Sequence, residues 1–327
     1  MSIGEIIERS TRDNHSLSDD DIRELLSVDV CSNDFYLILS ASNDYSRKKF
    51  SNKGYVFVQI GLNSEPCSGN CLFCSMGAEH FSVNAQWRKG PDEVVTEISQ
   101  IDQSDVDDIF LMTTADYPFE EYLQVVSKVR PLLDKGVRLV ANIRDFNLEE
   151  AYMLKAAGIT GAYHVNRLRE GIDTSLSVEQ RLVTLDAIKK SGLELYNCIE
   201  PIGAEHSYDE ILAEIVRARD LEPEVMAVMR RVNYPDSPLS GRNTVSVIEL
   251  VKIAAVTNIV VHPSRAMNLH EPEQMSLLAG VNQVYAEIGA NPRDTCNRTE
   301  MGRGLGIKQA GMMLSEAGYM CRLRYPH

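Results

Sequence analysis

Three closely spaced cysteines are the residues whose types and spacing most clearly predict chemistry. Cys67, Cys71 and Cys74 follow one another as C-x3-C-x2-C in the segment GLNSEPCSGNCLFCSMG. Thiolates at this spacing on a loop can converge on one centre, and soft sulfur ligands favour an iron–sulfur cluster or zinc. Three cysteines leave one iron of a four-iron cluster without a protein ligand, so that iron can bind a small molecule directly.

Zinc is the competing interpretation of the same residues. His80 follows Cys74 closely and completes a set of four zinc ligands. Zinc ribbons, however, usually pair two C-x2-C knuckles, and three thiols without a metal would be open to oxidation. We therefore expect a cluster and keep two alternatives, a zinc-dependent barrel hydrolase and a noncatalytic iron–sulfur carrier. The hydrolase would use Cys71, Cys74 and either His80 or His262.

The composition excludes several other classes of protein. The chain has 327 residues, 33 Lys and Arg against 47 Asp and Glu, and a net charge of −14, which disfavours binding to nucleic acid or to an anionic membrane. It has no apolar run long enough to span a bilayer and no signal-peptide pattern at residues 1–21, so we expect a cytoplasmic protein. Seven cysteines cannot all pair internally, which argues against a disulfide scaffold.

The elements that must position the cysteines alternate between short apolar runs and longer amphipathic segments. Parallel strands joined by crossover helices are expected from this alternation, and eight such units are typical of a (βα)₈ barrel, an α/β fold of the TIM type. A doubly wound open sheet is the alternative. The predicted strands are 55–60, 108–113, 137–142, 161–166, 193–199, 225–230, 258–263 and 282–288.

The remaining segments extend this barrel at both ends. Residues 1–50 are predicted to form an N-terminal helical cap, with Ser18 and the acidic residues 19–21 as a helix start. Residues 51–327 are predicted to form the barrel and its C-terminal extension, including a helix at 307–318 that packs outside it. Reactive groups of such barrels gather at the carboxyl ends of the strands. The cysteine segment directly follows the first strand, so it is expected at that end.

The cysteine spacing, with Phe73 immediately before the last cysteine, resembles the signature of radical S-adenosylmethionine (SAM) enzymes. The resemblance covers residues 50–320 and is strongest to the biotin-synthase-like branch. It implies that Cys67, Cys71 and Cys74 hold a [4Fe–4S] cluster whose fourth iron is chelated by SAM. It also implies reductive cleavage of SAM to a 5′-deoxyadenosyl radical that takes hydrogen from a small-molecule or cofactor-precursor substrate. An electron donor such as flavodoxin or ferredoxin, and a partner subunit, are implied partners.

The same resemblance assigns residues to SAM. The stretch 163–195 is similar to the branch's segment ending in a Glu/Gln-Arg-Leu helix, which implies that Arg181 contacts the SAM carboxylate and Glu170 its amine or ribose. Gly203 and Glu200, at the end of strand five, are candidates for the adenosyl group, and Asp116, after strand two, for the methionyl group. Arg181 and Glu170 are also explained as solvated charges, and Asp116 as a helix cap.

Residues at the ends of strands four to eight are expected to face the substrate. A lone histidine on a strand is more often a hydrogen-bonded core residue than a proton relay. Arg293 is equally explained as a surface residue of a turn. The candidates are His164, Asn166, His262, Arg265 and Arg293.

Biotin synthase carries an auxiliary [2Fe–2S] cluster held by three cysteines and an arginine. By resemblance, Cys198 and Arg265 take two of those positions, whereas Met112 and Asn142 take the other two. Two ligands cannot hold that cluster in the known manner, so biotin synthase itself is disfavoured. A sulfur-inserting enzyme with an auxiliary cluster recruited elsewhere stays open, with ligands from a partner subunit or from Cys31, Cys198, Cys296 and Cys321.

Overall fold

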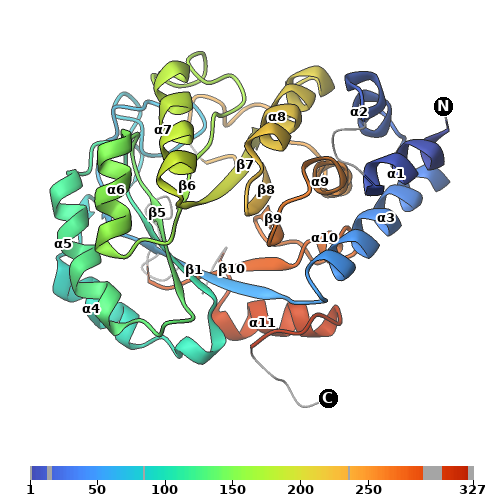
Figure 1. The fold of residues 1–327 in the computed structure, drawn as a ribbon. Helices are drawn as coiled ribbons and strands as arrows, with labels where there is room; N and C mark the ends of the chain where they lie inside the picture. Colours follow the sequence, from blue (N-terminus) through green and yellow to red (C-terminus); the bar gives the residue numbers. More distant parts are fainter. Residues whose placement is uncertain (1, 13–16, 84, 235, 290–303, 323–327) are drawn as a thin grey trace.

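The computed structural model describes residues 2–12, 17–83, 85–234, 236–289 and 304–322. Eight parallel strands close into a barrel in the order β1-β10-β9-β8-β7-β6-β5-β4, which confirms the predicted fold class and excludes the open sheet (Figure 1). The strands are β1 (Tyr55–Gly61), β4 (Asp108–Met112), β5 (Arg138–Asn142), β6 (Gly161–Tyr163), β7 (Glu194–Ile202), β8 (Val225–Arg230), β9 (Ala266–His270) and β10 (Gln283–Glu287).

Helices follow the strands around the outside of the barrel. Side-chain caps start several of them: Asn147 and Ser207 each form a capping box at the first turn of the helix that they precede. The predicted C-terminal helix packs outside β10 and β1, as expected. The helices are α4 (Pro91–Ser99), α5 (Phe119–Val129), α6 (Leu148–Ala157), α7 (Val178–Ser191), α8 (Tyr208–Leu221), α9 (Val247–Val261), α10 (Gln274–Leu277) and α11 (Ile307–Glu316).

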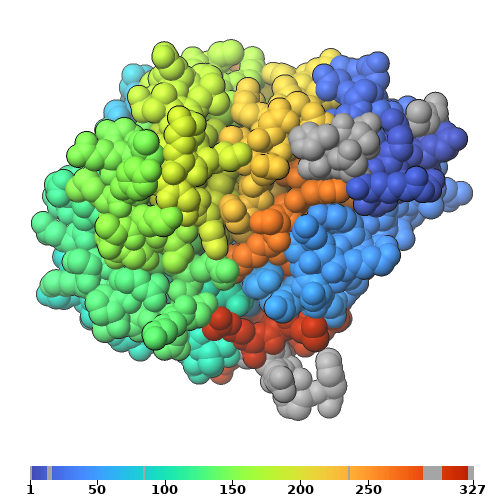
Figure 2. All heavy atoms as spheres, in the orientation of Figure 1, coloured from blue at the N-terminus to red at the C-terminus, as the bar shows by residue number. Residues whose placement is uncertain are grey.

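The N-terminal segment is helical, as predicted. Its helices are α1 (Ile3–Arg12), α2 (Asp19–Leu26) and α3 (Asn33–Lys49), and they pack against α8 and α9 on the outer side of the barrel. Figure 2 shows these blue helices lying against the yellow and orange second half of the barrel. Apolar side chains of α1–α3 belong to the same buried cluster as the outward-facing side chains of the strands. No helix among the described residues is long and apolar enough to cross a membrane.

One predicted strand is wrong. Residues 258–263 are not the seventh strand, because 258–261 are the last turn of α9 and His262 ends that helix in the left-handed conformation. The helix is buried along most of its length between the barrel and α3, so its sequence is apolar on every side and lacks helical periodicity. The seventh strand is β9. His262 and Arg265 therefore precede this strand, whereas the prediction from the sequence placed them at its end.

Candidate functional site

The cysteine loop lies at the carboxyl end of the barrel, as predicted. It leaves β2 (Asn63–Ser64), which follows β1, and returns at β3 (Trp87–Arg88). Backbone hydrogen bonds fold the loop on itself: Cys67 donates to the Met76 carbonyl at 2.8 Å, and Cys74 donates to the Cys71 carbonyl at 2.9 Å. All three cysteines line one pocket together with the strand ends. Burial raises the pKa of the Cys71 thiol to about 12.

Two side chains hold this loop in place, Asp116 from outside it and His80 from within it. Asp116 accepts hydrogen bonds from the Ser68 backbone N–H at 2.5 Å and from the Ser68 hydroxyl at 2.6 Å. His80 Nε2 lies 3.1 Å from the Cys71 carbonyl oxygen and 3.0 Å from that of Cys74. Asp116 therefore positions the loop and does not itself line the pocket, and His80 bonds to the backbone of the cysteines.

The zinc alternative does not fit this geometry. A tetrahedral zinc ion needs its ligand atoms about 3.5 Å apart. Among the described residues, the loop cysteines and His80 form no group whose ligand atoms all lie within 4.8 Å of one another. His262 stacks on Tyr45 of α3, outside the barrel, with ring centroids 4.5 Å apart. The described side chains are therefore not arranged as the zinc hydrolase set expected from the sequence.

Two buried arginines contribute to the same pocket as the cysteines. Arg181, predicted from the sequence, projects from α7, and Arg167, which sequence reasoning missed, follows β6. Arg167 Nη1 and Arg181 Nε are buried and donate no hydrogen bond among the described residues. These two atoms face the enclosed carboxylate of Glu170, while the guanidinium groups that carry them line the pocket, where an anionic group could bind. Arg167 comes directly after a predicted strand, so the rule that reactive groups follow strands could have found it.

Glu170 holds these arginines rather than facing the pocket. Its Oε2 lies 3.5 Å from Arg181 Nε and 3.7 Å from Arg167 Nη1, and accepts a hydrogen bond from the Arg167 backbone N–H. Its Oε1 accepts from the Thr174 hydroxyl at 2.6 Å. The carboxylate is fully enclosed by protein, which favours a positioning role over the predicted contact with SAM.

His164 does line the pocket, and it is part of a buried charged group. Its Nε2 lies 3.0 Å from Asp145 Oδ1, which is 3.2 Å from Arg181 Nη1. Burial lowers the pKa of His164 to about 4 against the opposing effect of Asp145. The imidazole is therefore neutral at pH 7. Asp145 was missed by sequence reasoning because it precedes a helix and carries no motif.

The inner wall of the pocket is formed by β6, β7 and β9. Glu200 lines it as predicted, with Oε1 3.1 Å from Arg167 Nε and Oε2 accepting a hydrogen bond from the Tyr163 hydroxyl at 2.7 Å. His270, the last residue of β9, lines it as well. Cys198 lies buried within the barrel, two residues before Glu200. His270 was not predicted because its strand was assigned to the wrong residues.

Several candidates are not brought to the pocket. Arg265 precedes β9 and lies at the amino end of the barrel, so the prediction that it follows strand seven and faces the substrate is wrong. Gly203 gives room to the Arg231–Glu205 ion pair, because a Cβ there would lie 2.2 Å from Arg231 Nη1. Asn166 donates a hydrogen bond to Glu214 and does not line the pocket. Phe73 does not line the pocket either. Arg293 and Cys296 lie outside the described residues.

Comparisons with known proteins decide the family. No protein-family model matches the chain. The chain is 28% identical over 297 residues to a biotin synthase of Synechococcus sp., covering 81% of this chain and 88% of that protein. It is 23% identical over 261 residues to a biotin synthase of Clostridioides difficile, covering 75% and 78%. The chain belongs to the radical SAM superfamily, in its biotin-synthase-like branch.

Solved structures agree with the barrel of this radical SAM protein. Methylornithine synthase (PylB) matches it with a TM-score of 0.83 at 17% identity, covering 97% of both chains. The [FeFe]-hydrogenase maturase HydG from Carboxydothermus hydrogenoformans matches with a TM-score of 0.80 at 17% identity, covering 97% of this chain and 78% of that one. At these identities the likeness concerns the fold.

The residues of the pocket fit the two cofactors of radical SAM enzymes, a [4Fe–4S] cluster and SAM. Three thiols from one loop line the pocket and would provide sulfur ligands to three irons. The guanidinium groups of Arg167 and Arg181, which line the pocket, fit the carboxylate of SAM. Together these side chains can hold an iron–sulfur cluster and, next to it, a ligand that carries a carboxylate.

Proposed function

We propose that this radical SAM enzyme abstracts hydrogen from an unactivated C–H bond of a small molecule bound in the pocket. The observation that carries the proposal is that Cys67, Cys71 and Cys74 line the same pocket as the buried guanidinium groups of Arg167 and Arg181. When bound, the reduced cluster and SAM supply a carbon-centred radical. An external electron donor of the flavodoxin or ferredoxin class provides the reducing electron.

The residues of this chain bind, orient and exclude water. Arg181 and Arg167 hold the carboxylate of SAM, while Glu170 and Glu200 fix the directions of the two guanidinium groups. Apolar side chains lining the pocket keep water from a reactive carbon. These lining side chains include Met76, Met112, Val165, Leu176 and Met229.

His164 contributes as a neutral group. Its Nε2–H points at Asp145, and the shared carboxylate also contacts Arg181. This arrangement fixes the position of Arg181, and burial keeps the imidazole from adding a further positive charge to the pocket. We therefore assign His164 to positioning and not to proton transfer.

The proposal is tested by comparing two cysteine variants after anaerobic reconstitution. Cys74→Ala removes one cluster ligand, whereas Cys31→Ala removes an exposed thiol in the turn between α2 and α3. We expect reductive formation of 5′-deoxyadenosine in the wild type and in Cys31→Ala, and a loss of more than about 100-fold in Cys74→Ala. Normal product formation in Cys74→Ala would refute the assigned cluster.

Sulfur insertion is a second candidate. It is favoured by Cys198, a buried thiol on a strand of the pocket wall, and by the biotin synthases among the relatives. Met112 and Asn142, at the ends of β4 and β5, offer no thiolate to a second cluster. Iron content separates the two candidates: about four irons per chain fit one cluster, and about six or more would favour sulfur insertion.

A further inference from the structure

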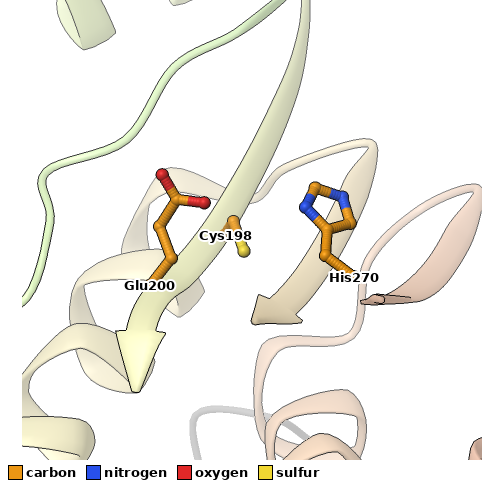
Figure 3. Close-up of side chains that lie close together, drawn as sticks. All are labelled: Cys198, Glu200 and His270. Atoms are coloured by element: carbon orange, nitrogen blue, oxygen red, sulfur yellow. The ribbon is translucent and has the colours of Figure 1, made fainter. Parts of the chain in front are cut away.

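A second group of metal-binding side chains lies inside the barrel, apart from the cysteine loop. Cys198 and Glu200 are two residues apart on β7, so both face inward, and His270 ends β9 two strands away. Figure 3 shows the three side chains side by side within the barrel. Their ligand atoms all lie within 4.8 Å of one another, and no other such group occurs among the described residues.

The three residue types match one kind of ion. Thiolate, imidazole and carboxylate together are ligands of zinc and of ferrous iron, whereas magnesium and calcium prefer oxygen alone. Tetrahedral coordination needs ligand atoms about 3.5 Å apart, so the three side chains, whose ligand atoms lie within 4.8 Å of one another, must move closer together when an ion binds. All three residues are at most 8% exposed, which shields an ion from competing water.

Surrounding side chains already hold the ligands in place. The Tyr163 hydroxyl donates to Glu200 Oε2 at 2.7 Å, and Arg167 contacts the other oxygen. The His270 ring stacks on Tyr163 with centroids 5.7 Å apart and meets Tyr285 edge-on at the same distance. Partners that orient the ligands from behind are typical of protein metal sites and contribute to their affinity.

The barrel also leaves space at this level. Ala227 on β8, the strand between β7 and β9, pairs with Cys198 and faces the inside of the barrel. Its side chain is only a methyl group, so it leaves room between Cys198 and His270. Met112 and Asn142, on the opposite strands, cannot add thiolates. The group therefore suits a single ion and not a cluster bound by several cysteines.

We propose that Cys198, Glu200 and His270 bind one divalent ion, zinc or ferrous iron, beneath the cysteine loop. Binding breaks the Cys198 S–H bond, forms a metal–sulfur bond and releases the proton to water, with no change of oxidation state. Three protein ligands leave a fourth position, which faces the pocket and takes a donor atom of the substrate. The proposal does not depend on the assigned cluster or on SAM cleavage.

Cobalt(II) binding tests the site without the cluster. The parent protein is Cys67→Ala/Cys71→Ala/Cys74→Ala, which removes the loop ligands. We expect it to bind about one equivalent of cobalt(II), with visible bands of a four-coordinate ion and a near-ultraviolet sulfur-to-cobalt band. Adding Cys198→Ala should remove the sulfur band and weaken binding about 100-fold, and adding His270→Gln about 10-fold or more. Zinc should displace the cobalt.

Controls separate this site from adventitious binding. Cys321→Ala and His262→Gln, which lie outside the barrel, should leave spectrum and affinity unchanged. Circular dichroism checks that each variant is folded, and Cys198→Ser or His270→Gln replaces Cys198→Ala if that variant unfolds. If the parent itself unfolds, the wild-type chain stripped of iron is titrated instead. Absence of cobalt bands, or bands that survive both Cys198→Ala and His270→Gln, would overturn the proposal.

Discussion

The two ends of the barrel use the same residue types for different purposes. At the amino end, Asp108 accepts hydrogen bonds from both Nη atoms of Arg265, at 2.9 and 3.0 Å, and from Gln283 at 2.8 Å. At the carboxyl end, Arg167 and Arg181 lie near Glu170 but keep buried donors without a hydrogen bond. Asp108 is hydrogen-bonded to both Nη groups of Arg265, whose Nε alone has no acceptor among the described residues. The guanidinium groups of Arg167 and Arg181 instead line the pocket, and they meet Glu170 only at 3.7 and 3.5 Å, respectively.

This difference separates structural from functional charges inside one fold. A buried, hydrogen-bonded ion pair contributes to stability only as a pair, since losing one partner leaves a buried charge. A guanidinium group that lines a pocket can in addition pair with the carboxylate of a ligand. Sequence position alone did not distinguish Arg265 from Arg167, because both lie next to strands. They differ in the end of the strand: Arg265 precedes β9, and Arg167 follows β6.

The largest effect is expected from the amino-end pair. Asp108→Asn leaves the Arg265 charge buried without its carboxylate and should reduce the free energy of unfolding by about 3–5 kcal/mol, measured by urea titration. Asp92→Asn, which breaks an exposed pair with Lys128, is the matched control and should cost less than about 1 kcal/mol. Equal losses of unfolding free energy in the two variants would show that the Asp108–Arg265 pair is not a structural pair of the amino end.

Protonation of His164 should destabilise the carboxyl end in acid. The folded protein binds a proton on this side chain only near pH 4, because burial lowers its pKa, whereas the unfolded chain binds it near pH 6.5. Stability should therefore fall as the pH decreases from about 6.5 to 4, by on the order of 2 kcal/mol more in the wild type than in His164→Gln. Parallel pH profiles of the two proteins would show that His164 is not held neutral.

Removing a pocket arginine should weaken the binding of SAM. Arg167→Gln removes the guanidinium group that we assign to the SAM carboxylate. It should weaken SAM binding about 10- to 100-fold, measured by equilibrium binding to the reconstituted protein. Arg138→Gln, whose guanidinium pairs with Glu194 at the amino end, is the control and should leave SAM affinity unchanged. A wild-type dissociation constant for Arg167→Gln would contradict the assignment.

The smallest effect is expected from the outer support of the cysteine loop. Asp116→Ala removes two hydrogen bonds to Ser68, worth about 1 kcal/mol together, and should speed the loss of iron to a chelator a few-fold. Asp102→Ala removes the same pair of bonds to Ser104 far from the loop and should not change that rate. If both variants lose iron at the wild-type rate, Asp116 has no role in holding the loop.

Local patterns made the fold and the cysteine loop predictable. C-x3-C-x2-C needs no distant contact to be recognised, and seven of the eight predicted strands overlap strands of the barrel, because apolar runs between amphipathic helices are local signals. The segment 258–263 failed because α9 is buried along most of its length and has no polar face to mark its period.

The rest of the site depends on contacts that the sequence does not display. Tyr163 meets Glu200 across adjacent strands, and Asp145 meets His164 from a loop before α6. His270 became a pocket residue only when the seventh strand was placed at Ala266–His270. Such partners are far apart in the chain, and no spacing rule connects them.

The central claim is that the cysteine loop and the pocket arginines together hold a cluster that SAM contacts directly. Electron paramagnetic resonance of the reduced, reconstituted protein tests it, because a ligand that binds an iron of the cluster changes the cluster's signal. We predict an iron–sulfur signal whose shape changes when SAM is added, and a weaker response to SAM in Arg167→Gln. A protein without such a signal, or a signal that saturating SAM leaves unchanged, would contradict the account.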